Sequence, residues 1–124
     1  MKKKILLVDD KGTFRVLVKL FLSNKYEVET AENGLQALSL LQHGYMPDAI
    51  VSDLMMPEVD GKTFLGQLKS SGALNHIPVI ILSSVDKSSE RVELIKSGAG
   101  DYMIKPFNPE ELEIRIENLL KKTA

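Results

Sequence analysis

ILLVDD, at residues Ile5–Asp10, joins four apolar residues directly to two acids. Continuous rather than alternating apolarity is typical of a strand that is covered on both faces of a parallel sheet. Ala49–Val51 and Val79–Leu82 have the same character, so we expect them to be central strands too. Tyr26–Thr30 alternates charged and apolar residues, which favours an edge strand, and Tyr102–Ile104 is a fifth short candidate.

Amphipathic segments follow each of these strands, and each segment predicts a helix. Asn33 is expected to cap the second helix, and the third is expected to run from about Gly61 to Ser70. The fifth has the clearest start, with Asn108 as N-cap, Pro109 at the first helical position and Glu111 completing a capping box. The side chains expected to face inward are Phe14, Leu17, Val18, Phe21, Leu22, Leu38, Leu41, Phe64, Leu65, Leu68, Val92, Ile95, Leu112, Ile116, Leu119 and Leu120.

The order of elements, strand then helix five times over, predicts an α/β fold with helices on both faces of a parallel sheet. We expect a single domain over residues 1–124, built on one doubly wound five-stranded sheet. Within that length there is no room for a second domain that could bind DNA.

Composition excludes several classes of protein. The net charge of −1 gives no reason to expect nucleic acid or a membrane surface as a direct partner. The absence of cysteine excludes disulfides and thiolate metal sites, and it is compatible with the cytoplasm, where we expect this protein. The apolar runs are too short to span a bilayer, and the run after the first lysines ends too early for a signal peptide.

Polar residues stand at the carboxyl ends of four predicted strands, where open parallel sheets bind their ligands. The first strand delivers Asp9 and Asp10, the third Asp53, the fourth Ser83 and the fifth Lys105. If the strand order is 2-1-3-4-5, the three acids come from adjacent central strands and converge.

Three converging carboxylates repel one another unless a cation neutralises them or one is protonated. A set of oxygen ligands without His or Cys favours a hard cation, which in a cell is Mg²⁺. A metal beside a carboxylate, with a lysine ammonium and a hydroxyl nearby, suits the stabilisation of a transferring phosphoryl group. The carboxylate itself can act as the nucleophile.

The sequence motifs resemble the receiver domains of two-component response regulators, over essentially the whole chain. The residues that carry the resemblance are Ile5–Asp10, Asp53–Pro57 (DLMMP) with Gly61, Ser83, and Gly98–Phe107 (GAGDYMIKPF). The resemblance implies a flavodoxin-like receiver fold with strand order 2-1-3-4-5. It also implies a sensor histidine kinase or a phosphotransfer protein as the phosphoryl donor.

The resemblance assigns the metal and acceptor roles to four residues. Asp53 is the implied phosphoacceptor. Asp10 and Asp53 are implied as direct ligands of Mg²⁺, with Asp9 in support and the backbone carbonyl of Met55 completing the set. The implied activity is not that of an enzyme with a separate substrate, because the domain catalyses only its own phosphorylation and dephosphorylation.

Three further residues receive roles by the same resemblance. Lys105 is implied to pair with the phosphoryl oxygens, aided by a cis peptide bond to Pro106. Ser83 supplies the hydroxyl that meets the phosphoryl group, and Tyr102 is the aromatic whose position follows phosphorylation. The implied output is a surface made by the fourth helix, fifth strand and fifth helix, which a partner protein or a second copy of the domain reads.

Two apolar residues bear on how long the phosphoryl group persists. Met55 lies two residues after Asp53, and Val85 lies two residues after Ser83. Neither side chain can orient a hydrolytic water by hydrogen bonding. We therefore predict slow self-dephosphorylation.

Other functions remain as alternatives. A phosphatase of the haloacid dehalogenase type needs Asp-x-Asp at one strand end, and position 55 is Met. A flavodoxin-like electron carrier needs a Ser/Thr/Gly cradle for flavin phosphate, but the loop after Val8 is acidic. An interaction module that ignores phosphate would not require the acid set, and single aspartates at strand ends also serve as helix caps.

Overall fold

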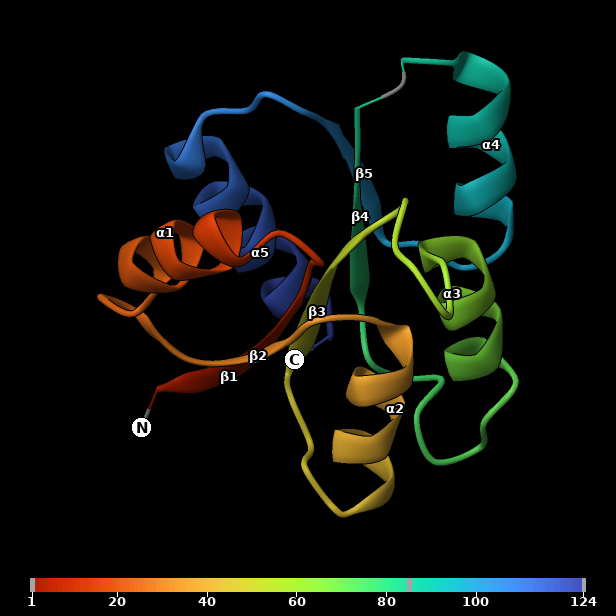
Figure 1. Ribbon diagram of the computed structural model, residues 1–124, viewed down its shortest axis with the longest axis horizontal. Coiled ribbons are helices and arrows are strands. Elements are labelled where there is room, and N and C mark those ends of the chain that lie inside the picture. The colour runs from red at the N-terminus through yellow and green to blue at the C-terminus, as the bar shows by residue number, and fades with distance from the viewer. Residues whose placement is uncertain (1, 85, 124) are drawn as a thin grey trace.

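Five strands and five helices alternate along the chain in the computed structural model, which describes residues 2–84 and 86–123 (Figure 1). The strands are β1 (Lys3–Val8), β2 (Tyr26–Ala31), β3 (Ala49–Asp53), β4 (Val79–Ser83) and β5 (Asp101–Ile104). The helices are α1 (Gly12–Leu22), α2 (Gly34–Gln42), α3 (Gly61–Lys69), α4 (Ser88–Lys96) and α5 (Pro109–Thr123). All strands pair in parallel in the order β2-β1-β3-β4-β5, which confirms the predicted fold.

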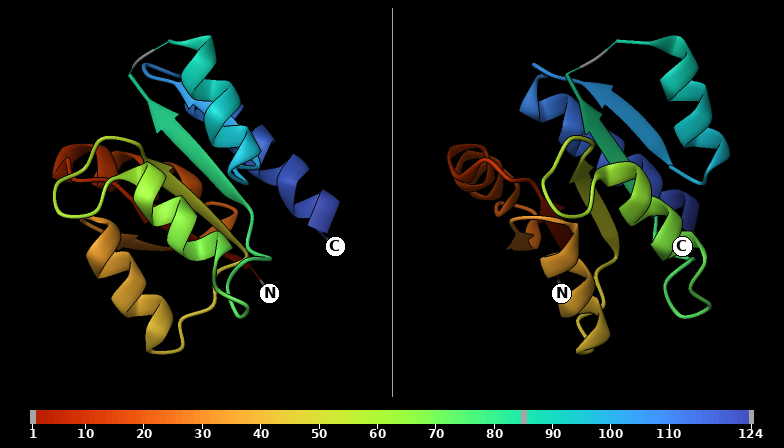
Figure 2. Two further views of the ribbon diagram at one scale, coloured as in Figure 1. Left: turned by 90° about the vertical axis from the view of Figure 1, so that its right-hand side faces the viewer. Right: turned by 45° about the vertical axis from the view of Figure 1, so that its right-hand side comes forward.

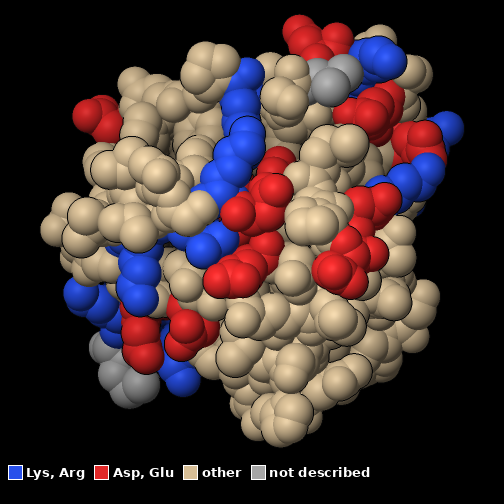
Figure 3. Space-filling model, in the orientation of Figure 1, with Lys and Arg blue, Asp and Glu red and all other residues tan. Residues whose placement is uncertain are grey.

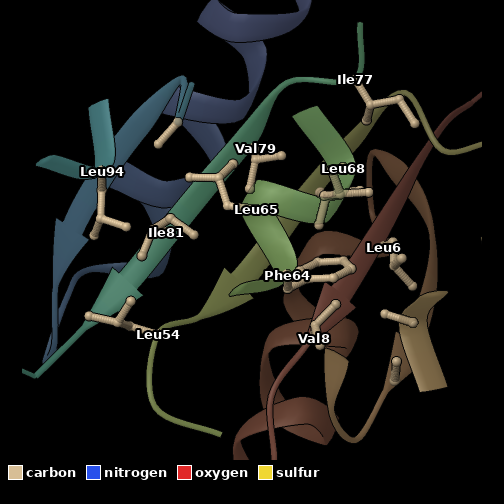
Figure 4. Close-up of a cluster of buried hydrophobic side chains, with 14 of the residues drawn as sticks. Leu6, Val8, Leu54, Phe64, Leu65, Leu68, Ile77, Val79, Ile81 and Leu94 are labelled. Carbon is tan, nitrogen blue, oxygen red and sulfur yellow. The ribbon is translucent and has the colours of Figure 1, made fainter. Parts of the chain in front are cut away.

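The helices cover both faces of the twisted sheet, α1 and α5 on one side and α2, α3 and α4 on the other (Figures 1 and 2). Successive residues of β1 point to opposite faces, so Leu6 joins the core beneath α2–α4 and Leu7 the core beneath α1 and α5. Phe64 of α3 is fully buried and lies against the sheet in the first of these cores (Figure 4). Continuous apolar strands are therefore explained by two cores rather than one.

The edge strand β2 keeps the alternation seen in its sequence. Val28 is buried, while its neighbours Glu27 and Glu29 are exposed. β2 pairs only with β1 among the described strands, so its other side is an edge of the sheet.

Three predicted inward-facing residues are exposed instead. Leu17 is 62% exposed, and Val92 and Ile95 are each 50% exposed. On α1 the strip of buried residues is narrower than the strip of apolar residues. On α4 the buried residue is Leu94, which lies nearly opposite Val92 on a helix of 3.6 residues per turn.

The predicted helix caps are confirmed in their main feature. Asn33 Oδ1 accepts a hydrogen bond from the Gln36 N–H at 2.8 Å. Asn108 Oδ1 accepts from the Glu110 N–H at 2.8 Å, whereas Glu111 pairs with Arg115 instead of completing a capping box. Within the described residues no helix is long and apolar enough to cross a bilayer.

Candidate functional site

Parallel pairing brings the predicted polar residues to one edge of the sheet. Asp9 follows β1, Asp53 and Ser83 are the last residues of β3 and β4, and Lys105 follows β5. Each carboxylate of Asp9, Asp10 and Asp53 has an oxygen within 4.8 Å of one on the other two. The structure thus brings Asp53 close to Asp9 and Asp10, from which it is distant in the sequence.

Two of these acids are buried and share one lysine. Asp9 Oδ2 accepts a hydrogen bond from Lys105 Nζ at 3.0 Å, and its Oδ1 accepts from the Lys11 N–H at 2.9 Å. Asp53 is 6% exposed, and its Oδ1 lies 3.4 Å from the same Lys105 Nζ. Asp10 is exposed, so the cluster opens to solvent on its side.

Negative charge exceeds positive charge around Asp53. Burial raises the pKa of Asp53 above its ordinary value, and the charge of Asp9 raises it further, while Lys105 works against both. On the face drawn in Figure 3, acidic side chains gather near the middle and basic side chains lie directly beside them. A bound divalent cation would favour the ionised form of all three carboxylates.

Lys105 is enclosed by its surroundings. Its Nζ lies 4.3 Å from the centroid of the Phe14 ring, a cation–π contact. Its backbone N–H donates to the Ser83 carbonyl at 2.7 Å, which ties β5 to β4 at this point. The peptide bond from Lys105 to Pro106 is cis, as expected.

Gly61 permits the close approach of α3 to the end of β3, where Asp53 lies, and to Leu54 after it. A Cβ at this position would lie 2.5 Å from the Asp53 carbonyl oxygen and 2.7 Å from Leu54 Cα. The Gly61 N–H donates to the Leu54 carbonyl at 2.8 Å. Met55, which follows in the loop after β3, is 67% exposed.

Ser83 and Tyr102 are buried on the α4 side of the acids. Ser83 is fully buried, and the Tyr102 hydroxyl donates to Glu90 Oε1 at 3.0 Å. Burial raises the pKa of Tyr102, a hydrogen bond with Ser83 works against that rise, and the bond to Glu90 adds to it. The residue Val85, singled out in the sequence, lies outside the described residues.

Sequence reasoning missed two contacts around this site. Glu90 contacts Tyr102, and Arg15 Nη1 donates to the Asp9 carbonyl at 2.6 Å while pairing with Glu32 at 3.7 Å. Both residues sit on helix surfaces, where a charged residue is the ordinary case. Only the position of each helix relative to the strands distinguishes them, and no local sequence pattern indicates that position.

Comparison with known proteins identifies relatives along the whole chain. The family model for the response regulator receiver domain matches residues 5–117. The response regulator MprA of Mycobacterium sp. (strain KMS) is 42% identical over 125 residues, covering 100% of this chain and 53% of that protein. Histidine kinase P4 of Formosa agariphila is 39% identical over 120 residues, covering 97% of this chain and 9% of that protein.

A solved structure gives the same result in three dimensions. The receiver domain of the Francisella response regulator 1452 superimposes with a TM-score of 0.91 at 37% identity, covering 99% of this chain and 100% of that one. The chain spans about half the length of the MprA relatives that it matches. On this evidence the chain belongs to the receiver domains of response regulators, the phosphoacceptor domains of two-component signalling systems.

Proposed function

We propose that Asp53 is the phosphoacceptor of this receiver domain, which spans residues 1–124. The observation that carries the proposal is the position of Lys105 Nζ, within 3.4 Å of carboxylate oxygens on both buried acids, Asp9 and Asp53. An ammonium held there can neutralise charge on a phosphoryl group attached to Asp53. Asp53 is also the acid that closes the central strand β3, next to the open side at Asp10.

The three carboxylates fit a Mg²⁺ ion, because their oxygens lie close together and one side of the cluster is open. Asp10 and Asp53 would bind the ion directly, with Asp9 in support and the Met55 carbonyl as a further ligand. When bound, the ion supplies positive charge to the phosphoryl oxygens.

The transfer is a displacement at phosphorus. A carboxylate oxygen of Asp53 forms the new P–O bond as the P–N bond of a phosphohistidine breaks, and the imidazole leaves with the electron pair. Lys105 stabilises the charge on the phosphoryl oxygens, and the Ser83 hydroxyl donates a hydrogen bond to one of them. The donor would be a sensor histidine kinase or a phosphotransfer protein, the partners with which response regulators work.

Hydrolysis of the aspartyl phosphate would be slow. Met55 is exposed two residues after Asp53, and its thioether is only a weak hydrogen-bond acceptor, so it cannot hold an attacking water in line. The phosphorylated form of this domain would therefore persist, and the domain would not act as an enzyme that turns over a separate substrate.

The output surface would lie on α4, β5 and α5. A hollow of about 450 Å³ opens there, and Arg91, Ile95, Tyr102, Phe107, Glu111 and Arg115 are among its lining residues. Movement of Tyr102 after phosphorylation would change this surface, which a protein partner or a second copy could read. We expect no direct contact of this domain with nucleic acid, because the net charge of −1 does not favour a polyanion.

The mass of the intact protein after incubation with acetyl phosphate tests the proposal. We expect one phosphoryl adduct that requires Mg²⁺ and is lost in Asp53→Asn. The matched control is Asp60→Asn, which changes an exposed aspartate that caps α3 a few residues away. An adduct that persists in Asp53→Asn would contradict the proposal, and steady turnover of a generic phosphate ester would favour a phosphatase.

A further inference from the structure

The aromatic ring of Phe14 lies against the ammonium group of Lys105. The distance from Lys105 Nζ to the ring centroid is 4.3 Å. The ring of Phe14 also meets the ring of Phe107 edge to face, with the two centroids 5.8 Å apart and an angle of 82° between the planes. Phe14 is half-buried and packs on the core beneath α1 and α5. The position of the ring is therefore fixed by its own packing and does not depend on Lys105.

The ammonium of Lys105 has partners of two kinds. Two of them are carboxylate oxygens, Asp9 Oδ2 at 3.0 Å and Asp53 Oδ1 at 3.4 Å. The third is the Phe14 ring, which is the one partner without charge among the described residues. The side chain of Lys105 is 16% exposed, so little water reaches it. Because a lysine side chain is long and flexible, these contacts decide where its ammonium lies.

A metal ion in the acid cluster would weaken two of the three contacts. Asp9 and Asp53 both belong to the group of carboxylates that fits Mg²⁺. A cation bound there offsets the negative charge that attracts the ammonium, and it also repels the ammonium directly. The Phe14 ring is not a ligand for Mg²⁺, which binds oxygen, so its attraction for the ammonium remains. The ring therefore matters most to Lys105 when the cluster is loaded with metal.

We propose that Phe14 is a positioning residue, which keeps the ammonium of Lys105 beside Asp53 while the carboxylates bind Mg²⁺. This inference rests on the proposed roles of Asp53 and Lys105 in phosphoryl transfer. Phe14 acts through Lys105, the group that stabilises charge on the phosphoryl oxygens. Loss of the ring lowers the fraction of metal-loaded molecules in which Lys105 is in place, and the rate of phosphorylation falls with that fraction.

The first test compares initial rates of phosphorylation by acetyl phosphate at saturating Mg²⁺, measured by intact mass. Phe14→Leu keeps an apolar side chain and removes the aromatic face. It is expected to lower the rate about fivefold to thirtyfold, the range that corresponds to a cation–π contact between an exposed and a desolvated site. Phe14→Tyr keeps the aromatic face and is expected to retain a rate within about twofold of wild type.

Phe21→Leu is the matched control, because it makes the same substitution two turns later on α1. Phe21 is also half-buried and packs on the same core, but within the described residues it has no contact with Lys105. The control is expected to leave the rate of phosphorylation unchanged. Urea denaturation of both leucine variants separates a loss of stability, which either substitution can cause, from a loss of rate.

The second test follows the position of Lys105 by NMR and needs no phosphorylation. The protons on Cε of Lys105, next to Nζ, lie in the field of the Phe14 ring, so their resonances are shifted upfield. Their assignment comes from their absence in Lys105→Met. The upfield shift is expected to persist in wild type and in Phe14→Tyr when Mg²⁺ is added. It is expected to persist in Phe21→Leu and to be lost in Phe14→Leu.

Several results would overturn the inference. They are a wild-type rate in Phe14→Leu, an equal fall in Phe21→Leu, a failure of Phe14→Tyr to retain the rate, and loss of the upfield shift when Mg²⁺ is added to wild type. A wild-type protein that takes up no phosphoryl group would instead overturn the proposed function. The NMR measurement would still show whether the ring holds Lys105, so the two failures are distinct.

Discussion

Replacing Gly61 with alanine places a methyl group where the structure has room only for hydrogen. The new Cβ would lie 2.5 Å from the Asp53 carbonyl oxygen, and an ordinary contact of 3.4 Å requires a shift of about 0.9 Å. Both contacting atoms belong to backbone, so no side chain can move aside. The shift must therefore displace either the start of α3 or the end of β3, where Asp53 lies.

We expect Gly61→Ala to lower the free energy of unfolding by about 1–3 kcal/mol, the usual effect of overpacking. We also expect the rate of phosphorylation by acetyl phosphate to fall by about tenfold to a hundredfold, because a displacement of about 1 Å at a reacting group has effects of this size. Urea denaturation and the intact-mass assay measure the two quantities separately.

Gly66→Ala is the control within the same helix. A Cβ at Gly66 meets no described atom within 4 Å, so the substitution is expected to stabilise α3 by about 0.5–1 kcal/mol and to leave phosphorylation unchanged. A Gly61→Ala protein with wild-type stability and wild-type phosphorylation would refute the steric argument.

Other substitutions test other parts of the structure. Tyr45→Phe is expected to raise the free energy of unfolding by about 1 kcal/mol in urea titrations, because its buried hydroxyl has no hydrogen-bond partner among the described residues. Asp53→Asn is expected to stabilise the metal-free fold at pH 7, because a raised pKa means that ionisation of Asp53 weakens the fold as pH rises. That gain should vanish in titrations below the ordinary pKa of aspartate, and a gain that persists there would contradict the reasoning. Mg²⁺ at 100 times its Kd is expected to add about 2.7 kcal/mol to the free energy of unfolding of wild type. It is expected to raise the melting temperature of Asp53→Asn by less. Met55→Asn is expected to shorten the lifetime of the phosphoryl adduct, followed by mass after removal of acetyl phosphate.

The sheet could be predicted because its strands are buried on both faces. Ile5–Val8 and Val79–Leu82 are continuous apolar runs. In a chain where strands and helices alternate, such runs are typical of central strands in a parallel sheet. The strand order could not be predicted from the residues, because no short sequence pattern indicates which parallel strands pair. The family resemblance implies it instead.

The acid cluster could be predicted for a related reason, since parallel strands bring their carboxyl ends to one edge. Contacts between a strand and a helix beside it could not be predicted in this way. Glu90 and Arg15 reach the site across distances set by helix placement, and each looks like an ordinary surface charge. The exposure of Leu17 has the same origin, because the packing angle of α1 decides how wide its buried strip is.

The acidic edge of β2 bears on the behaviour of the protein at high concentration. An uncovered strand edge can pair with the same edge of another molecule and so begin open-ended aggregation. Here Glu27 and Glu29 stand on that strand, so two edges that approached each other would bring four carboxylates close together. The resulting repulsion favours dispersed molecules, and an edge freed of charge by Glu27→Val and Glu29→Val should make the protein less soluble.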